Sequence, residues 1–280
     1  MRWTRGDRGN IEDRRGSSMR MGAMPLGIGG ILLLLVLSWF TGVDFLSLLG
    51  GGVEQTRVDT TGTTGPVETT PEEERTVDMV DSVMADAQEA WEQMMGGRYQ
   101  RTTAVLFRDA TTSGCGYAQS AVGPFYCPTD GKVYLDLSFF NDLRSRFGAP
   151  GEFAQAYVLA HEIGHHVQRL LGTESRVRQM QQANPSQQNE LSVRMELQAD
   201  CYAGVWGHAA SRPGGRVDID PGDIDDGLRA AAAIGDDTLQ KRAGGRVMPD
   251  KFTHGTSEQR ASWFRRGFES GDPNACNTFQ

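Results

Sequence analysis

The sequence predicts an α+β fold that is mainly helical with a small sheet, preceded by one apolar helix near the N-terminus. Apolar residues recur at helical spacing over residues 72–95, 153–171 and 191–206. Two short runs, 104–107 and 132–137, have the apolar or alternating pattern of strands. With 280 residues and 38% apolar content, the chain can bury one sizeable core.

The N-terminal segment has the charge pattern of a membrane anchor. Residues 1–22 contain six arginines and three acidic residues, and residues 24–43 contain no charge. This apolar span is long enough to cross about 30 Å of hydrocarbon as a helix, and a positive flank is expected in the cytoplasm. We therefore expect a cytoplasmic basic tail at residues 1–22 and a single transmembrane helix at residues 23–49. A cleaved signal peptide is the alternative, but the long basic region and the missing A-x-A site disfavour it.

The segment after the anchor predicts an exported domain on a tether. Residues 50–71 are rich in Gly, Thr and charge, which is typical of a flexible linker. This leaves residues 72–280 as one domain on the periplasmic or extracellular side of the membrane. The net charge of −8 disfavours nucleic acid as a partner.

Residues 132–137 indicate a strand, because Val133, Leu135 and Leu137 alternate with other residues. If this strand forms an edge of the sheet, a substrate peptide could add to it by main-chain hydrogen bonds. An interior strand is the alternative.

The residues from His161 to His165 match the pattern H-E-x-x-H inside a predicted helix. Residues four apart share one helix face, so the two imidazoles can bind one Zn²⁺ at about 2.0–2.1 Å. Glu162 lies one step around the helix, where it can take a proton from a water on the open side of the metal. His166 lies about 140° around from His161 and is not expected to bind the same ion. The glycine at position 164 has two possible explanations. A side chain there would crowd the face that binds the metal, or the helix packs closely against a neighbour.

A catalytic zinc normally has three protein ligands and one open position. Gln168 and Leu171 stand where one class of zinc peptidases has Gly and a third His, so that class is excluded. Glu196 on the next predicted helix is the expected third ligand. Asp200 lies four residues later on the same face and is expected to accept a hydrogen bond from a ligating imidazole. Glu190, near the start of that helix, is the reserve candidate.

Several motifs together resemble a known family, the membrane-anchored, YpfJ-like putative neutral zinc metallopeptidases of the gluzincin group. They are C-G at 115–116, F-Y-C-P at 125–128, V-Y-L-D-L-S-F-F at 133–140, H-E-I-G-H at 161–165, E-L-Q-A-D-C-Y-A-G at 196–204, F-T-H-G at 252–255, S-E-Q-R at 257–260, and G-D-P at 271–273 with Cys276. The resemblance covers nearly all of residues 100–280 and includes the N-terminal anchor. It implies a zincin-like metallopeptidase domain and a peptidase activity.

Four cysteines lie in the part of the chain expected outside the cytoplasm. Three pairings are possible, and we favour Cys115 with Cys127, which flank a short loop, and Cys201 with Cys276. Cysteine as a metal ligand is the alternative. It is disfavoured because the chain has no C-x-x-C and Cys201 lies about 140° around its helix from Glu196.

A peptidase also needs a group that stabilises the oxyanion of the tetrahedral intermediate. His254 is the candidate, although Thr256 and Gln259 fit a capping box in which His254 is an exposed turn residue. Tyr157, one turn before His161, is a weaker candidate. Residues 176–189 are polar and are expected as an irregular connection or as a lid over the cleft.

Together these features predict a membrane-anchored zinc peptidase. One Zn²⁺ is held by His161, His165 and Glu196, and Glu162 is the general base. The expected partner is a peptide or protein substrate, and an envelope protein could be a further partner. The alternatives are a non-catalytic, zinc-stabilised envelope scaffold and a latent peptidase that needs a partner. A structural zinc normally has four protein ligands, so Glu162 favours catalysis over the scaffold.

Overall fold

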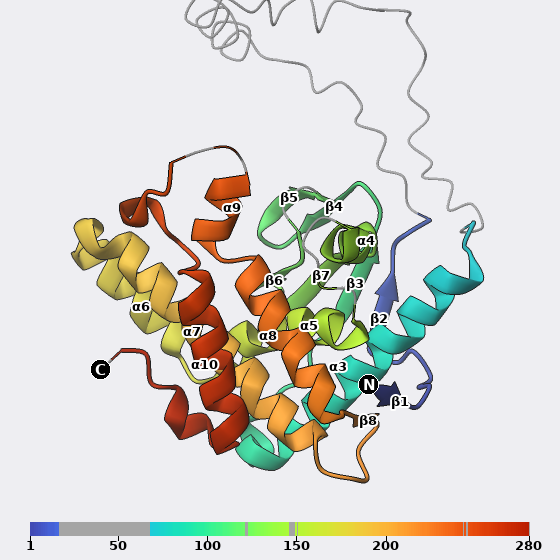
Figure 1. Ribbon diagram of the computed structural model, residues 1–280. Coiled ribbons are helices and arrows are strands. Elements are labelled where there is room, and N and C mark those ends of the chain that lie inside the picture. The colour runs from blue at the N-terminus through green and yellow to red at the C-terminus, as the bar shows by residue number, and fades with distance from the viewer. Residues whose placement is uncertain are drawn as a thin grey trace, which may run out of the picture. The chain divides into compact units, whose positions relative to one another are not determined.

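Helices α5 (Glu152–Leu170) and α7 (Gln188–Ala210) form the centre of the structure, and other helices pack around them (Figure 1). The computed structural model describes residues 1–16, 68–120, 123–145, 149, 151–242, 244 and 246–279. The surrounding helices in these ranges are α3 (Pro71–Met95), α4 (Ser138–Ser145), α6 (Thr173–Ala183), α8 (Pro221–Ala233), α9 (Asp236–Arg242) and α10 (Ser257–Ser270). Short 3₁₀ turns occur at Gly96–Arg98, Pro185–Gln187, Pro249–Lys251 and Pro273–Cys276.

A small mixed sheet lies beside α5. Its strands run in the order β2 (Ile11–Asp13), β3 (Ala104–Phe107), β7 (Lys132–Asp136) and β6 (Phe125–Cys127). The first three are parallel, and β6 is antiparallel to β7. Since β7 lies between β3 and β6, the hypothesis that residues 133–137 form an edge is wrong, and the alternative of an interior strand is confirmed. The edge on this side is β6.

Two further strand pairs complete the β-structure of the described ranges. β4 (Ala110–Ser113) and β5 (Gly116–Gln119) form a hairpin, and β1 (Arg2–Trp3) pairs antiparallel with β8 (Val217–Asp218). The polar residues 176–189 were expected as an irregular connection. They instead form most of α6, a 3₁₀ turn and the start of α7.

Two glycines allow the central helices to approach closely. A Cβ atom at Gly164 of α5 would lie 2.9 Å from the carbonyl oxygen of Ala199 on α7. A Cβ atom at Gly267 of α10 would lie 1.9 Å from the carbonyl oxygen of Cys201, also on α7. A methyl group does not fit at these separations. Gly164 therefore serves close packing of α5 on α7, and Gly267 serves close packing of α10 on α7.

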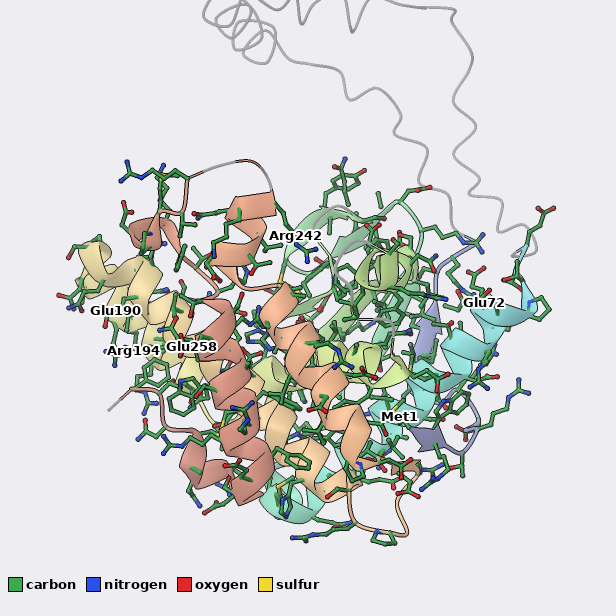
Figure 2. The ribbon with its side chains drawn as sticks, in the orientation of Figure 1. Met1, Glu72, Glu190, Arg194, Arg242 and Glu258 are labelled. Atoms are coloured by element: carbon green, nitrogen blue, oxygen red, sulfur yellow. A yellow bond between two sulfur atoms is a disulfide. The ribbon has the colours of Figure 1, made fainter. Side chains whose placement is uncertain are left out.

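The N-terminal residues belong to the folded unit. Met1–Gly16 and Pro66–Gln280 form one compact unit. β2 is a parallel strand next to β3, and β1 pairs with β8. The Met1 amino group lies 2.8 Å from the Asp223 carboxylate of α8 (Figure 2).

Arginines of this segment bind the acidic face of α3. Arg8 pairs with Glu74 at 2.6 Å and with Asp78 at 2.7 Å. Arg15, whose side chain is 2% exposed, pairs with Glu73 and Glu74 at 2.9 Å each. Arg8 and Arg15, two of the arginines that suggested a cytoplasmic tail, are therefore partners of carboxylates on α3.

These pairings correct the predicted membrane topology. The basic N-terminus predicts residues 1–22 in the cytoplasm and residues 72–280 on the other side of a membrane. Residues 11–13 and 104–106 are neighbours in one sheet, so they lie on the same side and the predicted localisation is wrong. Within the described ranges, no helix has the length and apolar character needed to span a membrane. The helix predicted at residues 23–49 and most of the predicted linker lie outside the described residues.

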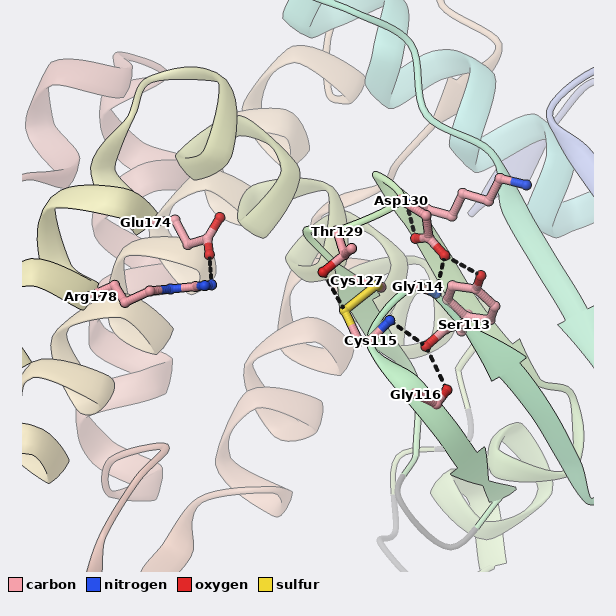
Figure 3. Close-up of a disulfide and its surroundings, with 11 residues drawn as sticks. Ser113, Gly114, Cys115, Gly116, Cys127, Thr129, Asp130, Glu174 and Arg178 are labelled. Carbon is pink, nitrogen blue, oxygen red and sulfur yellow. Dashed lines mark hydrogen bonds and ion pairs between the residues drawn. A yellow bond between two sulfur atoms is a disulfide. The ribbon is translucent and has the colours of Figure 1, made fainter.

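Two disulfides hold loops on the fold. Cys115, in the turn between β4 and β5, is bonded to Cys127 at the end of β6 (Figure 3). Cys201 of α7 is bonded to Cys276 in the last 3₁₀ turn, and both residues are fully buried. This is the pairing favoured from the sequence, and it leaves no cysteine thiol free as a metal ligand among the described residues.

Candidate metal centre

Three side chains from two helices converge where α5 and α7 pack together. They are His161 and His165 of α5 and Glu196 of α7, and their ligand atoms all lie within 4.8 Å of one another. His161 Nε2 lies 3.2 Å from both His165 Nε2 and Glu196 Oε2. His165 Nε2 lies 3.5 Å from Glu196 Oε1. The ligand set predicted from the sequence is therefore assembled in space.

The chemistry of these atoms fits Zn²⁺. His161 Nδ1 lies 2.8 Å from Asp200 Oδ1, and His165 Nδ1 lies 2.9 Å from Gln168 Oε1. When each Nδ1 donates its hydrogen to these oxygens, both Nε2 atoms present a lone pair toward the Glu196 carboxylate. Tetrahedral ligands at about 2.0–2.1 Å from Zn²⁺ lie about 3.3 Å from one another. The observed separations match this value.

The electrostatics favour a positive charge between these atoms. Burial lowers the pKa of His161, but the Asp200 and Glu196 carboxylates outweigh burial and raise this pKa to about 10. Burial raises the pKa of Glu196, but His165 and His161 outweigh it and hold the pKa of that carboxyl well below its usual value. A proton on His161 Nε2 and a metal cation therefore compete for the same position.

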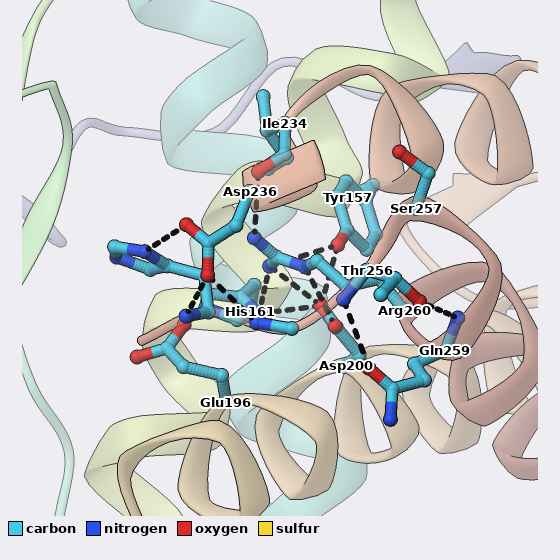
Figure 4. Close-up of polar contacts among 12 residues, drawn as sticks. Tyr157, His161, Glu196, Asp200, Ile234, Asp236, Thr256, Ser257, Gln259 and Arg260 are labelled. Atoms are coloured by element: carbon cyan, nitrogen blue, oxygen red, sulfur yellow. Dashed lines mark hydrogen bonds and ion pairs between the residues drawn. The ribbon is translucent and has the colours of Figure 1, made fainter. Parts of the chain in front are cut away.

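Asp200 is fully buried and joins three helices at the metal centre (Figure 4). Its Oδ1 accepts hydrogen bonds from His161 Nδ1 and from the Tyr157 hydroxyl, both on α5. Arg260 of α10 donates to the same carboxylate from Nε at 2.8 Å and from Nη2 at 2.9 Å. Burial raises the pKa of Asp200, but the Arg260 guanidinium and then His161 outweigh it and keep that pKa below its usual value. The carboxylate is thus held ionised behind the first ligand.

The ligand cluster opens into a cleft of about 840 Å³. Glu162 lines this cleft beside the ligands and is 7% exposed. Phe125 and Tyr126 of β6 line one part of it, and Ile234 and Leu239 line another. The cleft therefore combines a carboxylate next to the metal ligands with apolar walls.

His254 lines the same cleft from the loop before α10. Asp236, at the start of α9, accepts hydrogen bonds from the main-chain N–H groups of Thr253, His254 and Gly255 at 2.7, 2.7 and 3.1 Å. Its Oδ1 also lies 3.2 Å from His254 Nδ1, and this hydrogen bond raises the pKa of His254 more than burial lowers it. The capping box expected at Thr256 is present too, so the turn both caps α10 and carries His254 into the cleft.

Other candidates lie elsewhere or serve other contacts. Glu190 is exposed at the start of α7, where it pairs with Arg194 (Figure 2). His166 hydrogen-bonds the Tyr126 hydroxyl at 2.9 Å, and His208 hydrogen-bonds a carbonyl oxygen of α10. Among the described residues, neither His166 nor Glu190 belongs to the group of converging ligand atoms.

Two residues of the site were missed in the sequence. Arg260 shares the buried face of α10 with Phe264 and Gly267, and an arginine on an apolar helix face is the signal that could have revealed it. Gln168 was considered only as the residue that stands where one class of zinc peptidases has Gly. It is fully buried one turn after His165, and a buried polar residue needs a hydrogen-bond partner.

Comparison with known proteins gives the family. The family model described as "Putative neutral zinc metallopeptidase" matches residues 1–279. The chain belongs to this family. Among its family relatives, "Uncharacterized protein YpfJ" of Escherichia coli (strain K12) is 49% identical over 292 residues, which cover 100% of this chain and 99% of the relative. "Uncharacterized protein Mb2605" of Mycobacterium bovis and "Uncharacterized protein Rv2575" of Mycobacterium tuberculosis are each 47% identical over 197 residues, 68% of this chain and 66% of theirs. No solved structure matches the chain.

Proposed function

We propose that this protein is a zinc-dependent peptidase that hydrolyses peptide bonds in the cleft between α5, α7 and β6. The observation that carries the proposal is the convergence of His161, His165 and Glu196 beside Glu162 in one cleft. A structural zinc normally has four protein ligands, whereas three ligands and an open position are typical of a catalytic zinc. We expect one zinc per chain.

The residues of the centre have separate tasks in this proposal. His161 and His165 hold Zn²⁺ through Nε2, and Glu196 holds it through its carboxylate. When bound, Zn²⁺ lowers the pKa of a water to about 7 and polarises the scissile carbonyl. Glu162 accepts the proton of the attacking water and returns it to the nitrogen of the leaving amine. Asp200 keeps His161 in the tautomer that has its hydrogen on Nδ1.

His254 is proposed to stabilise the oxyanion that forms when the carbonyl is attacked. Asp236 accepts a hydrogen bond from His254 Nδ1–H, so Nε2 is the ring nitrogen left for the cleft, and it can donate when the ring is protonated. The raised pKa of His254 favours the protonated ring, and a charged donor stabilises an oxyanion more strongly than a neutral one. The residue thus adds to the stabilisation that the metal supplies.

The edge of β6 is proposed to bind the main chain of the substrate. Val133 N–H donates to the carbonyl oxygen of Thr103, the residue before β3, so the main-chain groups of Val133 face the β3 side. Tyr126 is the partner of Val133 across β6 and β7, so this is a pair without hydrogen bonds and the main-chain groups of Tyr126 face away from β7. Because Tyr126 also lines the cleft, an extended peptide can pair there and cross the metal centre.

The proposal is tested with the full chain, because residues 1–16 supply β2. Zinc-loaded protein is incubated with a diverse peptide mixture, and products are identified by mass spectrometry beside Glu162→Gln. We expect cleavage by the unmodified chain, a decrease of about 10²–10⁴-fold in the variant, and unchanged zinc content in both.

Glu190→Gln is the matched control, since Glu190 lies on the surface and outside the cleft. It is expected to cleave at the unmodified rate. Equal cleavage by Glu162→Gln, or no cleavage by fully zinc-loaded protein, would contradict the proposed function.

A further inference from the structure

Two buried glutamines connect His165 to the C-terminal segment of the chain. Gln168 of α5 is 0% exposed and Gln198 of α7 is 5% exposed. Gln168 Oε1 lies 2.9 Å from His165 Nδ1, and Gln168 Nε2 donates to Gln198 Oε1 at 3.1 Å. Gln198 Nε2 then donates to the carbonyl oxygen of Cys276 at 2.9 Å. These hydrogen bonds form a continuous relay behind the second histidine ligand.

Main-chain carbonyls set the direction of this glutamine relay. A carbonyl oxygen can only accept, so the Cys276 carbonyl requires Gln198 to present its NH₂ group and to turn its oxygen toward Gln168. The Met195 carbonyl oxygen, 2.7 Å from Gln168 Nε2, requires the matching orientation of Gln168. Gln168 therefore presents an acceptor to His165 Nδ1, which must carry the hydrogen. The lone pair is left on Nε2, the atom that faces the other two ligands.

The disulfide fixes the outer end of the relay. Cys276 is fully buried and is bonded to Cys201, which follows Asp200 on α7. Two residues further, the Thr278 hydroxyl donates to the carbonyl oxygen of Arg194 at 2.7 Å. The segment that carries the Cys276 carbonyl is thus held on α7 by a covalent bond and by a hydrogen bond.

We propose that Gln168 and Gln198 are positioning residues that fix the tautomer of His165, and that the Cys201–Cys276 disulfide supports zinc affinity through them. If the Gln168 amide turned over, its NH₂ group would face Nδ1 and favour the tautomer with hydrogen on Nε2, where the metal must bind. The inference rests on the zinc site of the proposed function, but it does not depend on peptide hydrolysis.

The test measures zinc affinity of the full chain by competition with a chelator. Gln168→Met keeps the side-chain length and removes both ends of the amide. We expect a decrease in zinc affinity of about 10–100-fold, the range found for residues that orient metal ligands. Gln198→Met is expected to give a smaller decrease in zinc affinity, because the main-chain carbonyl oxygen of Met195 still orients the Gln168 amide. It also carries the test if Gln168→Met does not fold. The double variant Cys201→Ala/Cys276→Ala is expected to lower affinity as well.

A second readout separates positioning from general loss of structure. Nitrogen-15 NMR of the zinc-free protein reports which ring nitrogen of His165 carries the hydrogen. We expect the Nδ1–H form in the unmodified chain and a mixture with Nε2–H in Gln168→Met.

The chain offers matched controls for both parts of the proposal. Gln88 is also 0% exposed and is hydrogen-bonded to Asn10 and Thr102, far along the chain from the ligands. Gln88→Met and the double variant Cys115→Ala/Cys127→Ala are expected to lower stability and to keep zinc affinity within about twofold, since neither touches the shell around the ligands.

Unchanged zinc affinity in Gln168→Met, or an equal loss in Gln88→Met, would overturn the positioning role. Unchanged affinity without the Cys201–Cys276 bond would overturn the role of the disulfide. Loss of zinc affinity in the expected order, in a protein that cleaves no peptide, would support the relay while the proposed peptidase function fails.

Discussion

Replacing Asp200 by Asn removes one buried charge and keeps the size of the side chain. Asp200 is 0% exposed and Arg260 is 2% exposed, so the guanidinium loses its counter-ion out of contact with water. Removing one partner of a buried ion pair costs about 3–5 kcal/mol, because the other charge remains buried. Asn keeps one acceptor oxygen, so we expect the free energy of unfolding to fall by about 3 kcal/mol, the lower end of this range. The whole free energy of unfolding of a domain is roughly 5–15 kcal/mol.

The assay for Asp200→Asn is urea unfolding of the zinc-free protein in the presence of a chelator. Bound zinc would add its own binding free energy to the folded state and obscure the difference. Tyr157→Phe is the control, because it removes one hydrogen bond to Asp200 and no charge. It is expected to cost about 1 kcal/mol. In the same proteins, Asp200→Asn is expected to lower zinc affinity by about 10–100-fold.

A double-variant cycle identifies the source of the loss. Arg260→Met alone leaves the carboxylate buried without its partner, whereas Arg260→Met combined with Asp200→Asn removes both charges. We therefore expect the double variant to be more stable than the sum of the two single losses predicts. Additive losses, or a loss under about 0.5 kcal/mol in Asp200→Asn, would refute the reasoning, since surface substitutions have effects of that size.

Other consequences concern the N-terminal segment and helix packing. Arg15→Met is expected to lower the free energy of unfolding by about 2 kcal/mol, less than for a fully buried pair because its α3 partners are 21% and 31% exposed. Burial raises the pKa of Glu74, but Arg8 and Arg15 outweigh burial and lower that pKa. The stabilisation from the ion pairs of Glu74 is therefore complete above the ordinary pKa of 4.5 and is lost as the pH falls further. A urea-unfolding midpoint that does not change between about pH 6 and 3 would argue against this contribution. Gly267→Ala is expected to lower the free energy of unfolding, measured with urea, by at least about 1–3 kcal/mol. Gly97→Ala is the control, because the space around a Cβ atom at Gly97 is open.

Local patterns in the sequence located the long helices and the three side chains that converge at the candidate metal centre. The apolar periodicity over residues 153–171 and 191–206 corresponds to α5 and α7. The four-residue spacings, His161 to His165 and Glu196 to Asp200, place each pair on one helix face. Because the two faces meet, the expected ligand set is the one that the structure brings together.

Contacts between distant segments were not visible in the sequence. β2 pairs with β3 across about ninety residues of chain, and no local pattern in Ile11–Asp13 indicates this partner. Without that partner, Arg8 and Arg15 were interpreted as a charge signal for membrane orientation. The strand at 132–137 was located, but its position between β3 and β6 depends on the same long-range pairing. Arg260 was missed because its carboxylate partner lies on another helix, sixty residues earlier.

X-ray absorption at the zinc edge tests the central claim most directly. The full chain, loaded with zinc, is compared with His165→Ala and Glu196→Ala. The account predicts one zinc per chain, bound by two imidazole nitrogens and by oxygen at about 2.0–2.2 Å, with weaker binding in both variants. Sulfur at about 2.3 Å, four protein ligands, or full occupancy in both variants would contradict a catalytic zinc centre formed by His161, His165 and Glu196.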